Sequence, residues 1–106
     1  MNEINVISLL LRSRFFERKI EEEFKKGNLY GTTHLSIGQE ASHTGLCLAL
    51  DEGDWFVPTH RCHGFNIASG SNMEAMFAEM LGSKNGLCKG LGGSMHMTDV
   101  ERYNLG

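Results

Sequence analysis

The sequence predicts an α/β fold that is locally mostly helical, with one or two short strands. The first 26 residues contain no glycine and carry apolar side chains at helical spacing, which predicts a long amphipathic helix. A capping-box pattern that begins at Ser71 marks another helix start. The run from Trp55 to Val57 is aromatic and β-branched, as expected for a short buried strand. The 106 residues and 41% hydrophobic content suit one domain with one core.

The first predicted element is a helical arm, residues 1–26. Glu21 and Lys25 form one of several oppositely charged pairs four residues apart, which support a helix. Gly27 is suited to the left-handed conformation that ends many helices. We expect the charges to be solvated and one stripe of apolar side chains to face the core, made of Ile4, Ile7, Leu11, Phe15, Ile20 and Phe24.

The middle of the chain alternates irregular segments with short predicted helices. Residues 28–36 have no helical period, whereas apolar and small residues recur in residues 39–50 and predict a second helix. Residues 51–54 form a turn signal that precedes the predicted strand. Residues 60–69 are expected to form a third helix, which ends at Gly70.

The last predicted helix runs from the capping box of Ser71 and Glu74 to Leu81, with Gly82 beyond its end. Five glycines follow within twelve residues, at positions 82, 86, 90, 92 and 93. The spacing matches neither a P-loop nor a dinucleotide-binding fingerprint. The stretch is either a flexible linker or a backbone shaped to approach another group closely, and its Met, His and Leu content favours the second interpretation.

Charge and composition exclude several classes of function. The net charge of −3 argues against a broad surface for nucleic acid. No apolar run approaches the roughly 20 residues of a bilayer span, and no signal-peptide pattern follows Met1, so we expect a cytoplasmic protein without a membrane partner. The cysteines Cys47, Cys62 and Cys88 are odd in number and lack a C-x-x-C pair, which predicts reduced thiols and no zinc site built from four cysteines.

Arg61 is the most informative polar residue, because residues 31–82 contain no other Arg or Lys. A lone cation near a helix start suits a phosphate or diphosphate group. An ion pair with Glu40 or Asp54 is an equally good interpretation. Two neighbours of Arg61, His60 and His63, make a superficial metal half-site with Cys62, but no second half-site follows. His34, on a loop near Glu40, has the residue type needed to move a proton.

Three motifs in this order and spacing are highly specific: Tyr30–Ala41 (YGTTHLSIGQEA), Thr59–Gly64 (THRCHG) and Gly86–His96 (GLCKGLGGSMH). The chain resembles the N-terminal part of the α subunit of thiamine-diphosphate-dependent 2-oxo acid dehydrogenase E1 components. Within that family it is most similar to the acetoin dehydrogenase branch. The resemblance implies that residues 1–106 are an N-terminal fragment of the thiamine-diphosphate-binding domain, because family members continue well beyond this length.

The resemblance also implies an activity and a set of site residues. The enzyme would cleave acetoin, or oxidatively decarboxylate a 2-oxo acid such as pyruvate, and pass the acyl group to the lipoyl-bearing E2 component. Arg61 falls on the arginine that contacts the diphosphate, and His60 takes the adjoining position. His34 falls on a histidine near the channel where the acyl or lipoyl group approaches. His63 and His96 match motif histidines whose role is equally compatible with a structural one.

The remaining parts of the implied site lie outside the sequence. The G-D-G...N motif that binds Mg²⁺ is absent, and the family's β subunit, in an α2β2 tetramer, supplies the catalytic carboxylate. The fragment alone is therefore expected to be inactive. The alternative is a small non-catalytic module that binds a metal or an anion through the cluster of His60, Cys62 and His63.

Overall fold

The computed structural model describes residues 2–29 and 31–106, and its regular structure there is helical. Met1, in the predicted arm, and Tyr30, which opens the first motif, lie outside the described residues. The elements in chain order are α1 (Glu3–Lys25), α2 (Glu40–Ala49), α3 (His63–Ser69), α4 (Met73–Met80) and the 3-10 helix η1 (Val100–Arg102).

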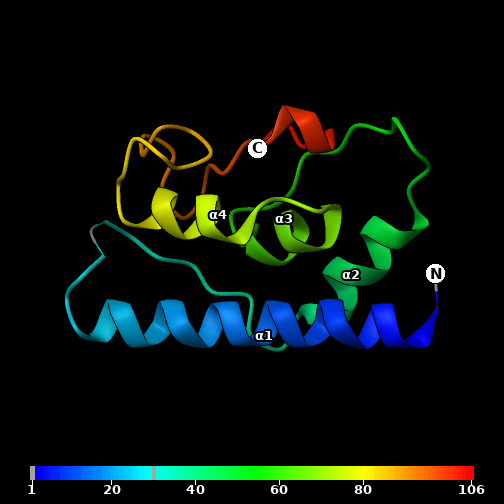
Figure 1. Cartoon of the computed structure of the whole chain (residues 1–106), viewed down its shortest axis with the longest axis horizontal. Coiled ribbons are helices and arrows are strands. Elements are labelled where there is room, and N and C mark those ends of the chain that lie inside the picture. Colours follow the sequence, from blue (N-terminus) through cyan, green and yellow to red (C-terminus); the bar gives the residue numbers. More distant parts are fainter. Residues whose placement is uncertain (1, 30) are drawn as a thin grey trace.

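The helices form two layers, which Figure 1 shows with α1 along one long side of the molecule. Helix α3 packs against both α1 and α2, and in the view of Figure 1 α3 and α4 both lie on the same side of α1. The glycine-rich loop that follows α4 and the η1 segment lie on the side away from α1. The core fills the space between the layers and consists of Phe16, Ile20, Leu29, Cys62, Ile67, Met76, Met80 and Met97.

The predicted arm forms α1, but the expected buried stripe is wrong. Of its six members only Ile20 is buried; five remain exposed, namely Ile4, Ile7, Leu11, Phe15 and Phe24. The buried face instead consists of Ser13, Phe16, Glu17 and Ile20. This face is buried because Glu17 has hydrogen-bond partners inside the molecule. The orientation of the helix therefore depends on a polar contact, which the spacing of apolar residues does not reveal.

The ends of the helices confirm the predicted glycine stops. Gly27 has φ +80°, and the N–H groups of Gly27 and Asn28 donate back to the carbonyls of Phe24 and Glu23, which is a Schellman arrangement. Gly70, with φ +101°, and Gly82, with φ +73°, lie in the left-handed region after α3 and α4. These helices therefore end where the sequence indicates.

Two predicted helix starts are displaced. Helix α3 begins at His63 and not at His60, because the preceding residues form an irregular segment in which the Arg61 N–H donates to Thr59 Oγ1 at 3.2 Å. The cap of α4 is Asn72, whose side chain accepts from the Ala75 N–H. The predicted capping residue, Ser71, donates its hydroxyl to Asp99 at 2.6 Å, so the capping-box prediction is wrong by one residue.

The predicted strand at residues 55–57 does not form. Phe56 makes a single parallel bridge with Asn104, while Trp55 is 53% and Val57 68% exposed. A strand needs neighbours along several residues, and the described residues provide one bridging partner. The mostly helical part of the fold prediction is thus confirmed, whereas strands are absent from residues 2–29 and 31–106. No described helix has both the length and the apolar character to cross a membrane.

Candidate functional site

The fold brings together the three predicted site residues: His34, His60 and Arg61. The rings of His34 and His60 meet edge to face, with centroids 4.9 Å apart. Arg61 donates from its guanidinium to the carbonyl of Leu35, the residue after His34. His60 is exposed, whereas His34 and Arg61 are half-buried. Two segments 26 residues apart therefore form one surface with a cation and two imidazoles.

Neither acidic residue that the sequence offered as an ion-pair partner binds Arg61. The carboxylate of Glu40 is held by the guanidinium of Arg14 and by the Gly38 N–H at 2.9 Å. The hydrogen bond from Arg14 lowers the pKa of Glu40 below its usual range. Asp54 accepts from the Asp51 N–H. Among the described residues, Arg61 therefore keeps guanidinium N–H groups for another acceptor.

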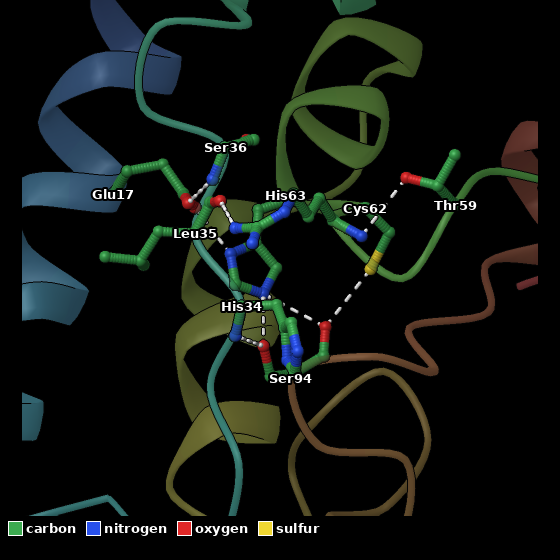
Figure 2. A network of polar contacts seen from close by, with 9 residues as sticks. Glu17, His34, Leu35, Ser36, Thr59, Cys62, His63 and Ser94 are labelled. Atoms are coloured by element: carbon green, nitrogen blue, oxygen red, sulfur yellow. Dashed lines mark hydrogen bonds and ion pairs between the residues drawn. The ribbon is translucent and has the colours of Figure 1, made fainter.

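A buried polar network lies beneath this surface (Figure 2). Glu17 and His63 are both fully buried, and Glu17 Oε1 lies 2.5 Å from His63 Nδ1. The other ring nitrogen of His63 lies 3.0 Å from the Ser94 carbonyl oxygen, and Glu17 Oε2 accepts from the Ser36 N–H at 2.7 Å. Because every polar atom of the pair has a partner, the network is a structural link between α1, α3 and the loop at Ser94.

Ser94 joins this network to the candidate site. Its hydroxyl accepts from the His34 N–H at 3.0 Å, and its carbonyl accepts from the Cys62 thiol at 3.2 Å. Figure 2 shows Ser94 facing His34, His63 and Cys62, which come from separate parts of the chain. The ring of His63 is thus fully buried, and both of its nitrogens have partners within the protein.

The histidine and cysteine cluster lacks the features of a metal or thiol site. Among the described residues, no group of three or more His, Cys, Asp or Glu side chains is arranged to hold a metal ion. Burial raises the pKa of the Cys62 thiol, which is the opposite of activation. Burial also raises the pKa of Cys47, to about 11. Nothing in the geometry favours the metal-binding module.

The glycine-rich stretch is a wrapped loop and not a flexible linker. Four of its backbone N–H groups, from Cys88, Gly90, Gly92 and Gly93, donate to the carboxylate of Glu79. Burial of this carboxylate opposes its ionisation, but the four donors outweigh that effect and lower the pKa of Glu79. The loop therefore has a defined path around a buried charge.

Sequence reasoning missed both buried carboxylates. Glu17 was expected to be solvated with the other charges of the arm, and Glu79 was not singled out, because carboxylates are rarely fully buried. A signal exists for Glu79, since it lies between Ala78 and Met80 in the predicted apolar stretch and precedes a run of glycines. Glu17 likewise stands between Phe16 and Ile20, one helical turn from each other. The detectable pattern is a carboxylate among the apolar residues of a predicted helix. For Glu79 a glycine-rich stretch also follows.

One protein-family model matches nearly the whole chain, including the helices, the buried polar network and the glycine-rich loop. It describes the dehydrogenase E1 component and covers residues 9–105. The chain belongs to the dehydrogenase E1 component family. This result confirms the family that the three motifs indicated.

Named relatives agree with the family. The chain is 46% identical over 97 residues to the α subunit of acetoin:2,6-dichlorophenolindophenol oxidoreductase from Bacillus subtilis, covering 92% of this chain and 29% of the relative. It is 42% identical to the α subunit of the pyruvate dehydrogenase E1 component from Rhizobium meliloti, covering 92% of this chain and 28% of that relative. It is 36% identical to a chloroplastic pyruvate dehydrogenase E1 α subunit from Arabidopsis thaliana, covering 92% of this chain and 23% of that relative. The chain thus spans less than a third of these relatives.

Proposed function

We propose that this chain is the N-terminal part of the α subunit of a thiamine-diphosphate-dependent E1 oxidoreductase. The observation that carries the proposal is the family match over residues 9–105. Relatives named for acetoin and for pyruvate are similar to nearly the same extent, at 46% and 42% identity. The substrate is accordingly acetoin or a 2-oxo acid. The α/β thiamine-diphosphate-binding fold belongs to the longer protein, and the cytoplasm is its proposed location.

The surface at Arg61 fits the diphosphate of the cofactor. The guanidinium has donors left over after its bond to Leu35, and no carboxylate among the described residues neutralises it. His60 is exposed beside it, and the buried Nδ1 of His34 lacks a hydrogen-bond partner in the described structure. Arg61 and His60 would hold the diphosphate by charge-assisted hydrogen bonds. When bound, thiamine diphosphate supplies the carbanion that attacks the substrate carbonyl.

The rest of the proposed assembly lies outside this chain. The Mg²⁺ ligands belong to the later part of the α subunit, and a β subunit completes the site in an α2β2 tetramer. His34 is proposed to act where the acyl group leaves for the lipoyl group of an E2 component. The contact of its ring with His60 and the bond from its backbone N–H to Ser94 hold this residue beside Arg61, which supports the proposal.

The test is the affinity of the full-length α subunit, assembled with its β subunit, for thiamine diphosphate at saturating Mg²⁺. We expect Arg61→Ala to weaken binding by about 1.5–3 kcal/mol, or roughly 10- to 150-fold, because one charged donor is lost. Arg18→Ala, at an exposed position on α1, is the matched control. Isothermal titration calorimetry measures both variants. Equal affinities for Arg61→Ala and the wild type would contradict the assignment.

A further inference from the structure

Glu79 is a charged side chain that the proposed chemistry does not use. Its residue is fully buried on α4, between the apolar Met76 and Met80 in helical register. One carboxylate oxygen accepts from Cys88 N–H at 2.6 Å and Gly90 N–H at 3.0 Å. The other accepts from Gly92 N–H at 2.8 Å and Gly93 N–H at 3.0 Å. Four donors directed at one carboxylate favour its negatively charged form.

Around this carboxylate the loop passes close to neighbouring backbone, so that two of its glycines have no space for a side chain. A Cβ at Gly92 would lie 2.3 Å from the carbonyl oxygen of His96, and a Cβ at Gly90 would lie 2.4 Å from that of Gly82. Both glycines therefore permit close backbone approach, which is how they bring their N–H groups to one point. The carboxylate and the glycines together set the position of residues 88–93.

The loop continues directly into the candidate site. Gly93, held by Glu79, is followed by Ser94, whose hydroxyl accepts from the His34 N–H at 3.0 Å. The same hydroxyl lies 3.1 Å from His63 Nε2, so Ser94 is fixed from two sides (Figure 2). A shift of the loop would thus move the backbone that carries the His34 ring.

We propose that Glu79 is a positioning residue of the active site: its carboxylate fixes Gly92 and Gly93, and through Ser94 it sets the position of His34. This inference rests on the proposed function, in which His34 lies where the acyl group leaves. The substitution Glu79→Gln would remove the negative charge of the carboxylate. The amide NH₂ would face two backbone N–H donors where a carboxylate oxygen accepts both, and the loop would have to move away.

The test compares two reactions of the full-length α subunit assembled with its β subunit. In the first, the two electrons from the substrate reduce 2,6-dichlorophenolindophenol, the dye in the names of two relatives, and water takes the acyl group and releases it as the free acid. In the second, the lipoyl disulfide of an isolated lipoyl domain takes both electrons, so that one sulfur receives the acyl group and the other becomes a thiol. The dye is small and diffuses freely, whereas the lipoyl arm must meet the residues at the mouth of the site.

We expect Glu79→Gln to lower the ratio of the lipoyl rate to the dye rate by roughly tenfold or more, because small displacements of a reacting group are costly. A purely structural role would reduce the folded fraction and both rates in proportion, leaving the ratio unchanged. That result would overturn the inference. Glu74→Gln, exposed on the same helix, is the control and should keep the wild-type ratio.

A second variant keeps the inference testable if Glu79→Gln fails to fold. Ser94→Ala removes the hydroxyl that accepts from His34 but leaves the carboxylate and its four donors in place. We expect the same direction of change in the rate ratio, and an unchanged ratio would overturn the inference. A wild-type enzyme that binds no thiamine diphosphate would instead refute the proposed function, so the two failures are distinguishable.

Discussion

At the residue scale, Gly64 shows how closely α2 and α3 approach. A Cβ on Gly64 would lie 2.3 Å from the Nδ1 atom of His43, a buried side chain whose ring stacks on Phe65 with centroids 4.1 Å apart. Gly64→Ala should therefore separate the two helices and cost about 1–3 kcal/mol of unfolding free energy. Urea denaturation measures the change.

The control for this prediction lies on the facing helix. Gly45 has nothing within 4 Å of its would-be Cβ, so Gly45→Ala should leave stability unchanged or raise it by about 0.5–1 kcal/mol through helix propensity. If Gly64→Ala were tolerated as well as Gly45→Ala, the close approach of the helices would not hold.

The candidate site could be predicted only in part at this scale. Arg61 stood out because it is the lone cation in a long stretch, and the structure leaves its guanidinium without a carboxylate among the described residues. Glu17 was expected to be solvated, because the desolvation cost of its carboxylate is offset by donors that are distant in sequence. Ser36 and His63, which hold Glu17, lie 19 and 46 residues away.

At the element scale, helix existence was predictable and helix orientation was not. Helix α1 forms where the glycine-free arm indicated, yet it buries Ser13 and Glu17 and exposes Ile7 and Phe15. The spacing of apolar residues indicates which side chains share a face of the helix. Which face is buried depends on all the contacts between the helix and the rest of the molecule. Here the hydrogen bonds of Glu17 and the packing of Phe16 on His63 select it.

The cap of α4 gives a prediction at this scale. Asn72 accepts from the Ala75 N–H at 2.9 Å, so Asn72→Ala leaves that donor without its partner and should cost about 1 kcal/mol. Asn72→Asp keeps the acceptor and adds a negative charge near the positive end of the helix, so it should retain stability. Thermal unfolding of both variants measures the difference. Equal losses would show that the side chain does not cap the helix.

At the scale of the whole molecule, the strand prediction failed for a general reason. The residues from Trp55 to Val57 have strand composition, but a sheet is a non-local structure that requires partners over several residues. The backbone of Phe56 pairs with Tyr103 and Leu105 around one bridge at Asn104, and pairing does not extend further. Local composition alone therefore wrongly indicated a buried strand, because composition does not report whether neighbouring strands exist.

Three of the groups whose pKa is lowered in the folded protein are buried, namely His43, Glu40 and Glu79, and each makes the stability depend on pH. Burial lowers the pKa of His43 below its usual 6.5, against the opposing effect of the charges on Glu17 and Glu40. The hydrogen bond from Arg14 lowers the pKa of Glu40 below the usual 4.5. For Glu79, burial raises the pKa, but the backbone donors lower it further than burial raises it, so its net pKa is also below 4.5.

A group whose pKa is lower in the folded state takes up its proton more readily when the chain unfolds, so its contribution is lost as pH falls. The unfolding free energy should therefore decline first below pH 6.5, from His43, and again below pH 4.5, as the pH passes through the folded pKa values of Glu40 and Glu79, together with those of Glu22 and Glu23 on α1. His43→Phe keeps a stacked ring without a titrating group, so the first decline should shrink while the second remains. Urea titrations from about pH 8 to about pH 3 measure both proteins. Identical declines of wild type and His43→Phe above pH 4.5 would show that His43 is not held neutral by burial.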